Sequence, residues 1–96
     1  MTKAKPGSVS WGTLRTEDLI DSFLDFLELH KHPRYSGLRD EYEEILTHED
    51  TREEYMEYLL NEDIFDAMQD LSPEGHYFGA HPGDGADFGY WEIEED

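Results

Sequence analysis

The excess of carboxylates is the feature that most constrains this chain. Its 96 residues contain 25 Asp and Glu against 7 Lys and Arg, which gives a formal net charge of −18. No acid precedes Glu17, and no Lys or Arg follows Arg52. Repulsion among so many like charges destabilises a compact state, so packing must offset it. The same charge disfavours direct binding to nucleic acid or to an anionic membrane.

Apolar and aromatic residues are numerous enough for one modest core. Hydrophobic residues make up 36% of the chain and aromatic residues 14%, whereas disordered acidic tails are poor in rings. We therefore expect residues 1–96 to form a single small acidic domain, with residues 1–8 flexible. The chain has no cysteine, so it has neither disulfides nor thiolate sites. Without a membrane-spanning apolar run or a signal-peptide core, it is predicted to be cytoplasmic.

The clearest helical pattern follows Thr16, in "EDLIDSFLDFLELHK". We expect Thr16 to be the N-cap, because a hydroxyl followed by Glu17 and Asp18 suits the first turn of a helix. Apolar residues with helical spacing form one face: Leu19, Ile20, Phe23, Leu24 and Leu27. A continuous acidic stripe lies opposite: Glu17, Asp21, Asp25 and Glu28.

Two further helical regions come after this one. Pro33 and "SG" at 36–37 interrupt the pattern, and a second, shorter amphipathic helix then runs from about Leu38 to Leu46. A capping box of Thr51 and Glu54 predicts the start of a third helical region over roughly 52–71. Two interpretations of this region stay open. It is one straight helix whose rings Tyr55, Tyr58 and Phe65 point away from the helical core and meet another element or a partner, or it breaks at Asn61.

The C-terminal stretch "HYFGAHPGDGADFGYWEIEED" predicts two aromatic-rich strands around the turn "PGDG". Phe88 and Tyr90 should share one face of the second strand, with Trp91 and Ile93 on the other. In the turn we expect positive φ angles at the glycines and backbone bonds to Asp84. A hairpin alone is marginally stable, so a third strand at residues 9–14 is expected to complete an antiparallel sheet. The predicted fold class is therefore α+β.

The same stretch holds residue types that could form a chemical site. It lacks the basic residue and the succeeding helix of a phosphate cradle. His76, His81, Asp84 and Asp87 supply metal-ligand types, and His30 and His32 form an H-x-H, but no H-E-x-x-H or EF-hand spacing accompanies them. No nucleophile motif is present, and carboxylates are too widespread to mark a catalytic pair. We predict a structural hairpin in a non-enzyme, with no metal and no cofactor.

Two blocks of the sequence, "WGTLRTEDLIDSFLDFL" and "PEGHYFGAHPGDGADFGYW", resemble a group of small acidic proteins of phages and mobile elements. The blocks cover about a third of the chain, and the group has no established activity. The resemblance implies a phage context rather than a mechanism. Small acidic phage proteins include inhibitors of host defence, such as anti-CRISPR proteins, and some of these imitate nucleic acid.

The net charge of the chain, −18, is close to that of a DNA segment as long as the domain. A domain of this length has a diameter of roughly 32 Å, and that length of duplex DNA carries about 19 charges. Acids spaced along one helix lie about 5–6 Å apart, which is sparser than the ~3.4 Å between phosphates of one strand. Two adjacent acidic stripes would approach the required density.

We therefore expect an acidic inhibitor that occupies the basic DNA- or RNA-binding surface of a host defence protein, such as a CRISPR effector or a restriction enzyme. Carboxylates would pair with its Arg and Lys, and exposed rings would anchor the contact. Two alternatives stay open: a general protein-interaction module that uses exposed aromatics, and a salt-adapted acidic protein. The candidate partner-binding residues are Glu17, Asp21, Asp25, Glu28, Asp40, Glu43, Glu44, Glu53, Glu54, Glu57, Glu62, Asp63, Asp66, Tyr55, Tyr58 and Phe65.

Overall fold

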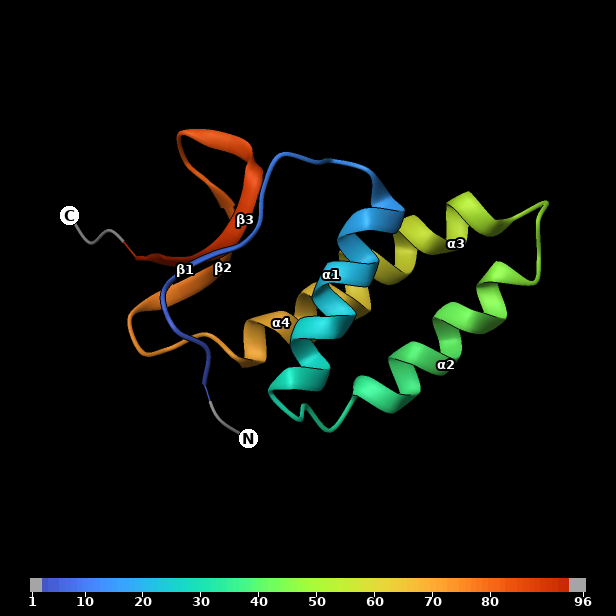
Figure 1. Cartoon of the computed structure of the whole chain (residues 1–96), viewed down its shortest axis with the longest axis horizontal. Helices are drawn as coiled ribbons and strands as arrows, with labels where there is room; N and C mark the ends of the chain where they lie inside the picture. The colour runs from blue at the N-terminus through green and yellow to red at the C-terminus, as the bar shows by residue number, and fades with distance from the viewer. Residues whose placement is uncertain (1–2, 94–96) are drawn as a thin grey trace.

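A computed structural model describes residues 3–93 and confirms the predicted α+β class (Figure 1). The helical part and the sheet lie at opposite ends of the molecule, which measures 45 × 29 × 20 Å. In chain order the elements are β1 (Gly7–Ser10), α1 (Thr16–Leu29), α2 (Tyr35–Leu46), α3 (Arg52–Tyr58), a π-helical segment (Leu59–Ile64), α4 (Phe65–Asp70), β2 (His76–His81) and β3 (Asp84–Glu92).

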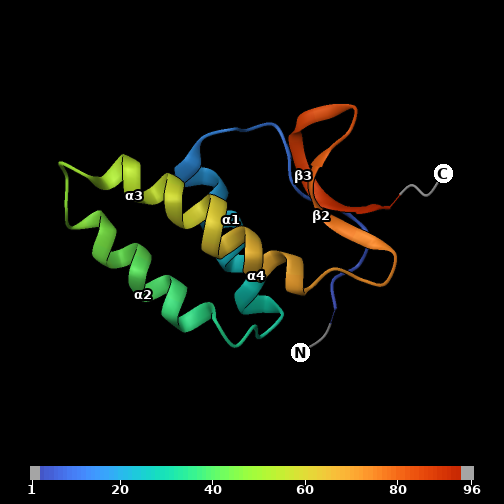
Figure 2. The same ribbon diagram turned by 180° about the vertical axis from the view of Figure 1, so that it is seen from behind.

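The helices form three rods, because α3, the π-helical segment and α4 continue one another. Figure 1 shows α1 in front of this third rod with α2 beside them, and Figure 2 shows the same arrangement from behind. The apolar face predicted for α1 is buried in full, from Leu19 to Leu27. Phe23 joins the helices to the sheet, since its ring packs edge-on against Phe78 with the centroids 5.2 Å apart.

The third rod differs from both interpretations of its sequence. It neither runs as a regular α-helix nor breaks at Asn61, because one π-helical segment carries the chain through that region. Residues seven apart share a face of an α-helix, but the wider i→i+5 turn rotates the residues beyond it onto another face. Tyr58 before the segment is 66% exposed, whereas Phe65 after it is half-buried against Phe23 and Phe78. Phe65 therefore meets another element, as the first interpretation allowed, but its prediction as an exposed partner-binding ring is wrong.

The sheet is three-stranded and antiparallel in the order β1-β3-β2, as the sequence predicted. The first strand, however, lies at Gly7–Ser10 rather than at 9–14, and Trp11 falls in the exposed loop after it. β1 approaches the central strand closely at Gly89. A Cβ there would overlap the backbone of Gly7 and Ser8, so only glycine fits.

The C-terminal hairpin matches its prediction in most respects. Phe88 and Tyr90 both point into the core, and the Tyr90 hydroxyl donates to the backbone oxygen of Met68 at 2.7 Å. Asp84 Oδ1 accepts the amide of Ala86 at 3.0 Å, as expected of a turn aspartate. Positive φ angles do not occur at the turn glycines, so that expectation is wrong. They occur at three other glycines, Gly7, Gly12 and Gly75.

The start of the chain and the helix caps also differ from expectation. Flexibility was predicted for residues 1–8, yet Ala4 is buried and its amide donates to the backbone oxygen of Leu71 at 2.8 Å. The first part of that segment, residues 1–2, lies outside the described residues. Thr16 is the first helical residue rather than the N-cap of α1. Thr51 is the N-cap of α3 but forms no side-chain capping bond.

Candidate acidic interface

Carboxylates of the first and third rods are brought together around Glu17, which lines two neighbouring hollows. One hollow, of about 480 Å³, lies between α1 and α2, and the other, of about 320 Å³, lies between the start of α1 and α3. The stripe predicted on α1 therefore continues onto α3. We call this surface the acidic row, and it consists of Glu17, Asp21, Asp25, Glu43, Glu53 and Glu57.

The α1 part of the row is formed by helical spacing alone. Glu17, Asp21 and Asp25 are four residues apart, so they lie above one another on the exposed face of α1. Partial burial raises the pKa of the Asp21 carboxyl, and repulsion from Glu17 and Asp25 adds to that rise. The charged form of Asp21 is thus disfavoured in the fold, as expected where like charges crowd together.

α2 contributes the opposite wall of the first hollow. The Arg39 guanidinium lies there, donating to Glu43 Oε1 at 3.2 Å and to the Tyr35 hydroxyl at 2.8 Å. Tyr42 is buried beside it, and burial together with the charges of Asp21 and Glu17 raises its pKa to about 12. Arg39 therefore offsets only part of the repulsion among the acids that line this hollow.

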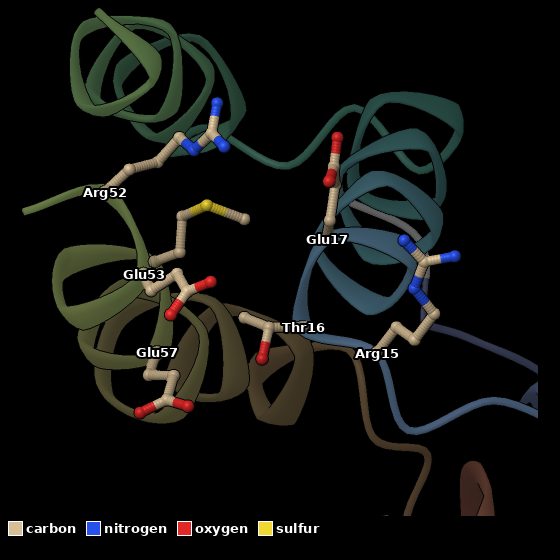
Figure 3. A pocket seen from close by; sticks show the side chains of 7 residues that line it. Arg15, Thr16, Glu17, Arg52, Glu53 and Glu57 are labelled. Atoms are coloured by element: carbon tan, nitrogen blue, oxygen red, sulfur yellow. The ribbon is translucent and has the colours of Figure 1, made fainter. Parts of the chain in front are cut away.

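The second hollow places arginines beside acids, as Figure 3 shows. Arg52 and Glu53 come from the α3 side, Arg15 and Glu17 come from the start of α1, and Thr16 lies between the two sides. Among residues 3–93, Arg52 has no carboxylate within ion-pair distance. The row is therefore a surface in which acids predominate, with arginines at its margins.

A second group of acids is held by basic side chains within the protein. Arg34 Nη1 lies 3.0 Å from Asp66 Oδ2, and its Nη2 lies 3.7 Å from Asp63 Oδ1. The buried His32 accepts the amide of Arg34 at Nδ1, so Nε2 carries the proton of the neutral ring and donates it to Asp70 at 3.1 Å. We call these residues the tied cluster: His32, Arg34, Asp63, Asp66 and Asp70.

The structure thus divides the predicted partner-binding residues. Tyr55 is 53% exposed and lines a third hollow with Glu44, between α2 and α3. Phe65 belongs to the core, and Asp63 and Asp66 belong to the tied cluster. The remaining predicted residues are exposed but line none of these three hollows: Glu28, Asp40, Glu54, Tyr58 and Glu62.

Sequence reasoning did not select several residues of these surfaces. Arg39 and Tyr42 line the first hollow, and Glu41 and His48 line the third. The i, i+4 spacing of Arg39 and Glu43 was a usable signal for their ion pair. Nothing in the sequence placed Glu41 and His48 together at one hollow, because their relative position depends on how α2 meets α3.

Within residues 3–93, no three His, Asp or Glu side chains lie close enough to hold a metal ion. In the same range, no helix combines the length and the apolar character needed to cross a membrane.

Comparison of the chain with protein-family models, curated proteins and solved structures found no match. Its function must therefore be argued from the surface itself.

Proposed function

We propose that this protein is a non-enzymatic, phage-encoded inhibitor that imitates nucleic acid. It acts in the cytoplasm of the host, where it occupies the basic DNA- or RNA-binding surface of a defence protein such as a CRISPR effector or a restriction enzyme. The observation that carries the proposal is the acidic row, which unites carboxylates from three helices on one surface. The resemblance of two sequence blocks to small acidic phage proteins supports the biological context.

The spacing of the row fits this role better than one helix would. Neighbouring acids of α1 are about 6 Å apart along the axis, which is sparser than the phosphates of one DNA strand. Glu43 across the first hollow and Glu53 and Glu57 across the second add charges beside that line. The row is therefore denser in carboxylates than α1 alone, which brings it nearer to the charge density of a nucleic-acid backbone.

The electrostatics of the row also favour a basic partner. Partial burial, together with repulsion from Glu17 and Asp25, makes the ionised Asp21 unfavourable in the free protein, as its raised pKa indicates. Arg and Lys side chains of a target would relieve that repulsion on binding. Such complementarity speeds association and selects partners by the pattern of charge.

The test is affinity capture from a host lysate that contains CRISPR and restriction systems, with and without competing duplex DNA. We expect a basic nucleic-acid-binding protein to be captured and to be displaced by the DNA. The double variant Asp21→Lys/Glu53→Lys should no longer capture this protein. Glu74→Lys/Glu92→Lys changes the net charge equally at the exposed sheet end and should keep it. Equal loss in both variants would show that total charge, and not the row, binds the partner.

A general protein-interaction module is the second candidate, because large rings are exposed outside the row. Tyr58 is 66% and Trp11 69% exposed, and each ring could cover apolar surface on a partner. This function predicts a captured protein that DNA does not displace and that Tyr58→Ala or Trp11→Ala releases. If nothing is captured under any condition, the acidity is better explained as adaptation to salt.

A further inference from the structure

The third hollow singles out Tyr55 among the exposed rings. It has a volume of about 280 Å³ and lies where α2 ends and α3 begins, at the end of the molecule farthest from the sheet (Figures 1 and 2). Its lining combines an aromatic ring, an aliphatic side chain and two carboxylates: Tyr55, Ile45, Glu41 and Glu44, with His48 at the same site. Tyr58, one turn further along α3, does not line it.

From this combination we infer that the hollow receives one arginine side chain of the partner protein. The inference rests on the proposed function and names the anchor of that contact. A volume of this size is below that of typical cofactor or substrate pockets, and it suits a single long side chain. A guanidinium stacks on an aromatic face while its N–H groups reach carboxylates, which a compact, strongly hydrated ammonium does less well.

Charge complementarity supports this occupant. Glu41 and Glu44 have no basic partner within ion-pair distance among residues 3–93, so both carboxylates are available. The hollow also lies at the C-terminal end of α2, a twelve-residue helix with no basic side chain in its last turn. The partial negative charge of a helix C-terminus attracts cations, and here nothing in that turn neutralises it.

The aromatic wall makes this a docking surface rather than a patch of acids. Tyr55 is about half exposed, so a guanidinium can cover its ring, while Ile45 packs against the core and offers apolar contact to the stem of the side chain. The ring also distinguishes this hollow from the acidic row, where the one tyrosine, Tyr42, is buried.

The experiment uses the whole protein and the peptide acetyl-Gly-Arg-Gly-amide, with the lysine analogue as comparison. Both peptides are titrated into the protein at pH 8. We expect saturable shifts of the Tyr55 ring and Ile45 methyl signals in ¹H–¹³C spectra. Arginine should bind more tightly than lysine. Tyr55→Leu should weaken arginine binding about tenfold, and Tyr58→Leu should leave it unchanged.

Two results would overturn the inference. One is a set of shifts spread over all acidic surfaces with equal affinity for both peptides, which indicates unspecific attraction. The other is unchanged binding in Tyr55→Leu. Neither depends on the host partner, so the inference and the proposed function fail separately. If lysate capture succeeds while Tyr55→Leu leaves peptide binding unchanged, the acidic row alone binds the target.

Discussion

The acidic row and the tied cluster are both built from carboxylates, but those of the row crowd together and those of the cluster are bound by basic side chains. In the tied cluster, Arg34 and His32 hold three aspartates and join the loop before α2 to the third rod. In the row, Arg39 and two marginal arginines face six carboxylates, and the ionised Asp21 is disfavoured. The net charge of a chain therefore says little about which acids are available to a partner. The pairing of each acid within the fold decides that.

The comparison assigns binding to the row and stability to the tied cluster. Changes at the acids of the row other than Glu43, which pairs with Arg39, should alter affinity while the fold stays as stable or becomes more so, since they remove repulsion. Changes in the tied cluster should lower the stability of the fold and leave the affinity for the partner unchanged. A row variant that lowers stability without weakening binding would contradict the first assignment. A cluster variant that weakens binding without lowering stability would contradict the second.

The largest effect is expected from Asp21→Lys/Glu53→Lys in the row. Each reversal replaces an attraction to the basic partner by a repulsion, so affinity for the captured target should fall at least about 100-fold. The midpoint of urea unfolding should not fall. Isothermal titration and denaturation of the same preparation measure both quantities. A variant that unfolds more easily but still binds would place this part of the row among the residues that stabilise the fold.

His32→Ala tests the tied cluster. His32 is 4% exposed and joins the Arg34 amide to the Asp70 carboxylate, so its loss leaves two polar groups without their partner and a cavity. We expect the free energy of unfolding to fall by about 2 kcal/mol. His48→Ala, at an exposed histidine, is the control and should change it by less than about 0.5 kcal/mol. Partner binding of folded His32→Ala should be unchanged.

The helices and the hairpin could be predicted because their signals are local. The spacing from Leu19 to Leu27 is sufficient to define the buried face of α1, and alternation is sufficient to place Phe88 and Tyr90 on one face. β1 was predicted too late in the sequence because alternation around Trp11 resembles a strand. Its true position depends on the close approach to Gly89, which is a contact between residues far apart in the chain.

The division of the acids could not be predicted for the same reason. Asp63 and Asp66 read like any other exposed helical acids, and only the fold brings Arg34 to them across about thirty residues of chain. The π-helical segment left no clear signal in "LLNEDI", yet it turns Phe65 inward and leaves Tyr58 outside. Local sequence therefore identified the acidic helices, and long-range packing decided which of their acids remain free.

Tyr42 offers a smaller test, on the wall of the first hollow. Its folded pKa of about 12 lies above the ordinary value of 10, so the folded state keeps the proton that the unfolded chain loses. Stability should therefore decline as pH rises from 10 towards 12. Tyr42→Phe removes this contribution, and its decline over that range should be smaller by about 1–2 kcal/mol. Urea unfolding at pH 8 and at pH 11 measures the difference, and at pH 8 the variant should match the parent closely. Equal decline in both proteins would show that neither burial nor the nearby acids raise the pKa of this hydroxyl.

The smallest effect is expected from Asp21→Asn, which removes a charge that both partial burial and repulsion within the row disfavour. The raised pKa means that the folded state binds this proton more tightly than the unfolded chain, so the ionised group destabilises the fold above that pKa. Removing the charge should raise the free energy of unfolding at pH 7 by about 0.5 kcal/mol, or the melting temperature by roughly 2–4 °C. The gain should shrink in 0.5 M salt, which screens exposed charges, and it should vanish as the pH falls below the ordinary aspartate value of 3.8.

Asp63→Asn is the matched change in the tied cluster, where the same substitution weakens a bond to Arg34 and should lower the melting temperature instead. Opposite signs for one chemical change at two sites would establish that the fold, rather than the composition, separates free acids from paired ones. Equal signs would mean that the net charge dominates at both, and the distinction between the row and the cluster would then lose its energetic basis.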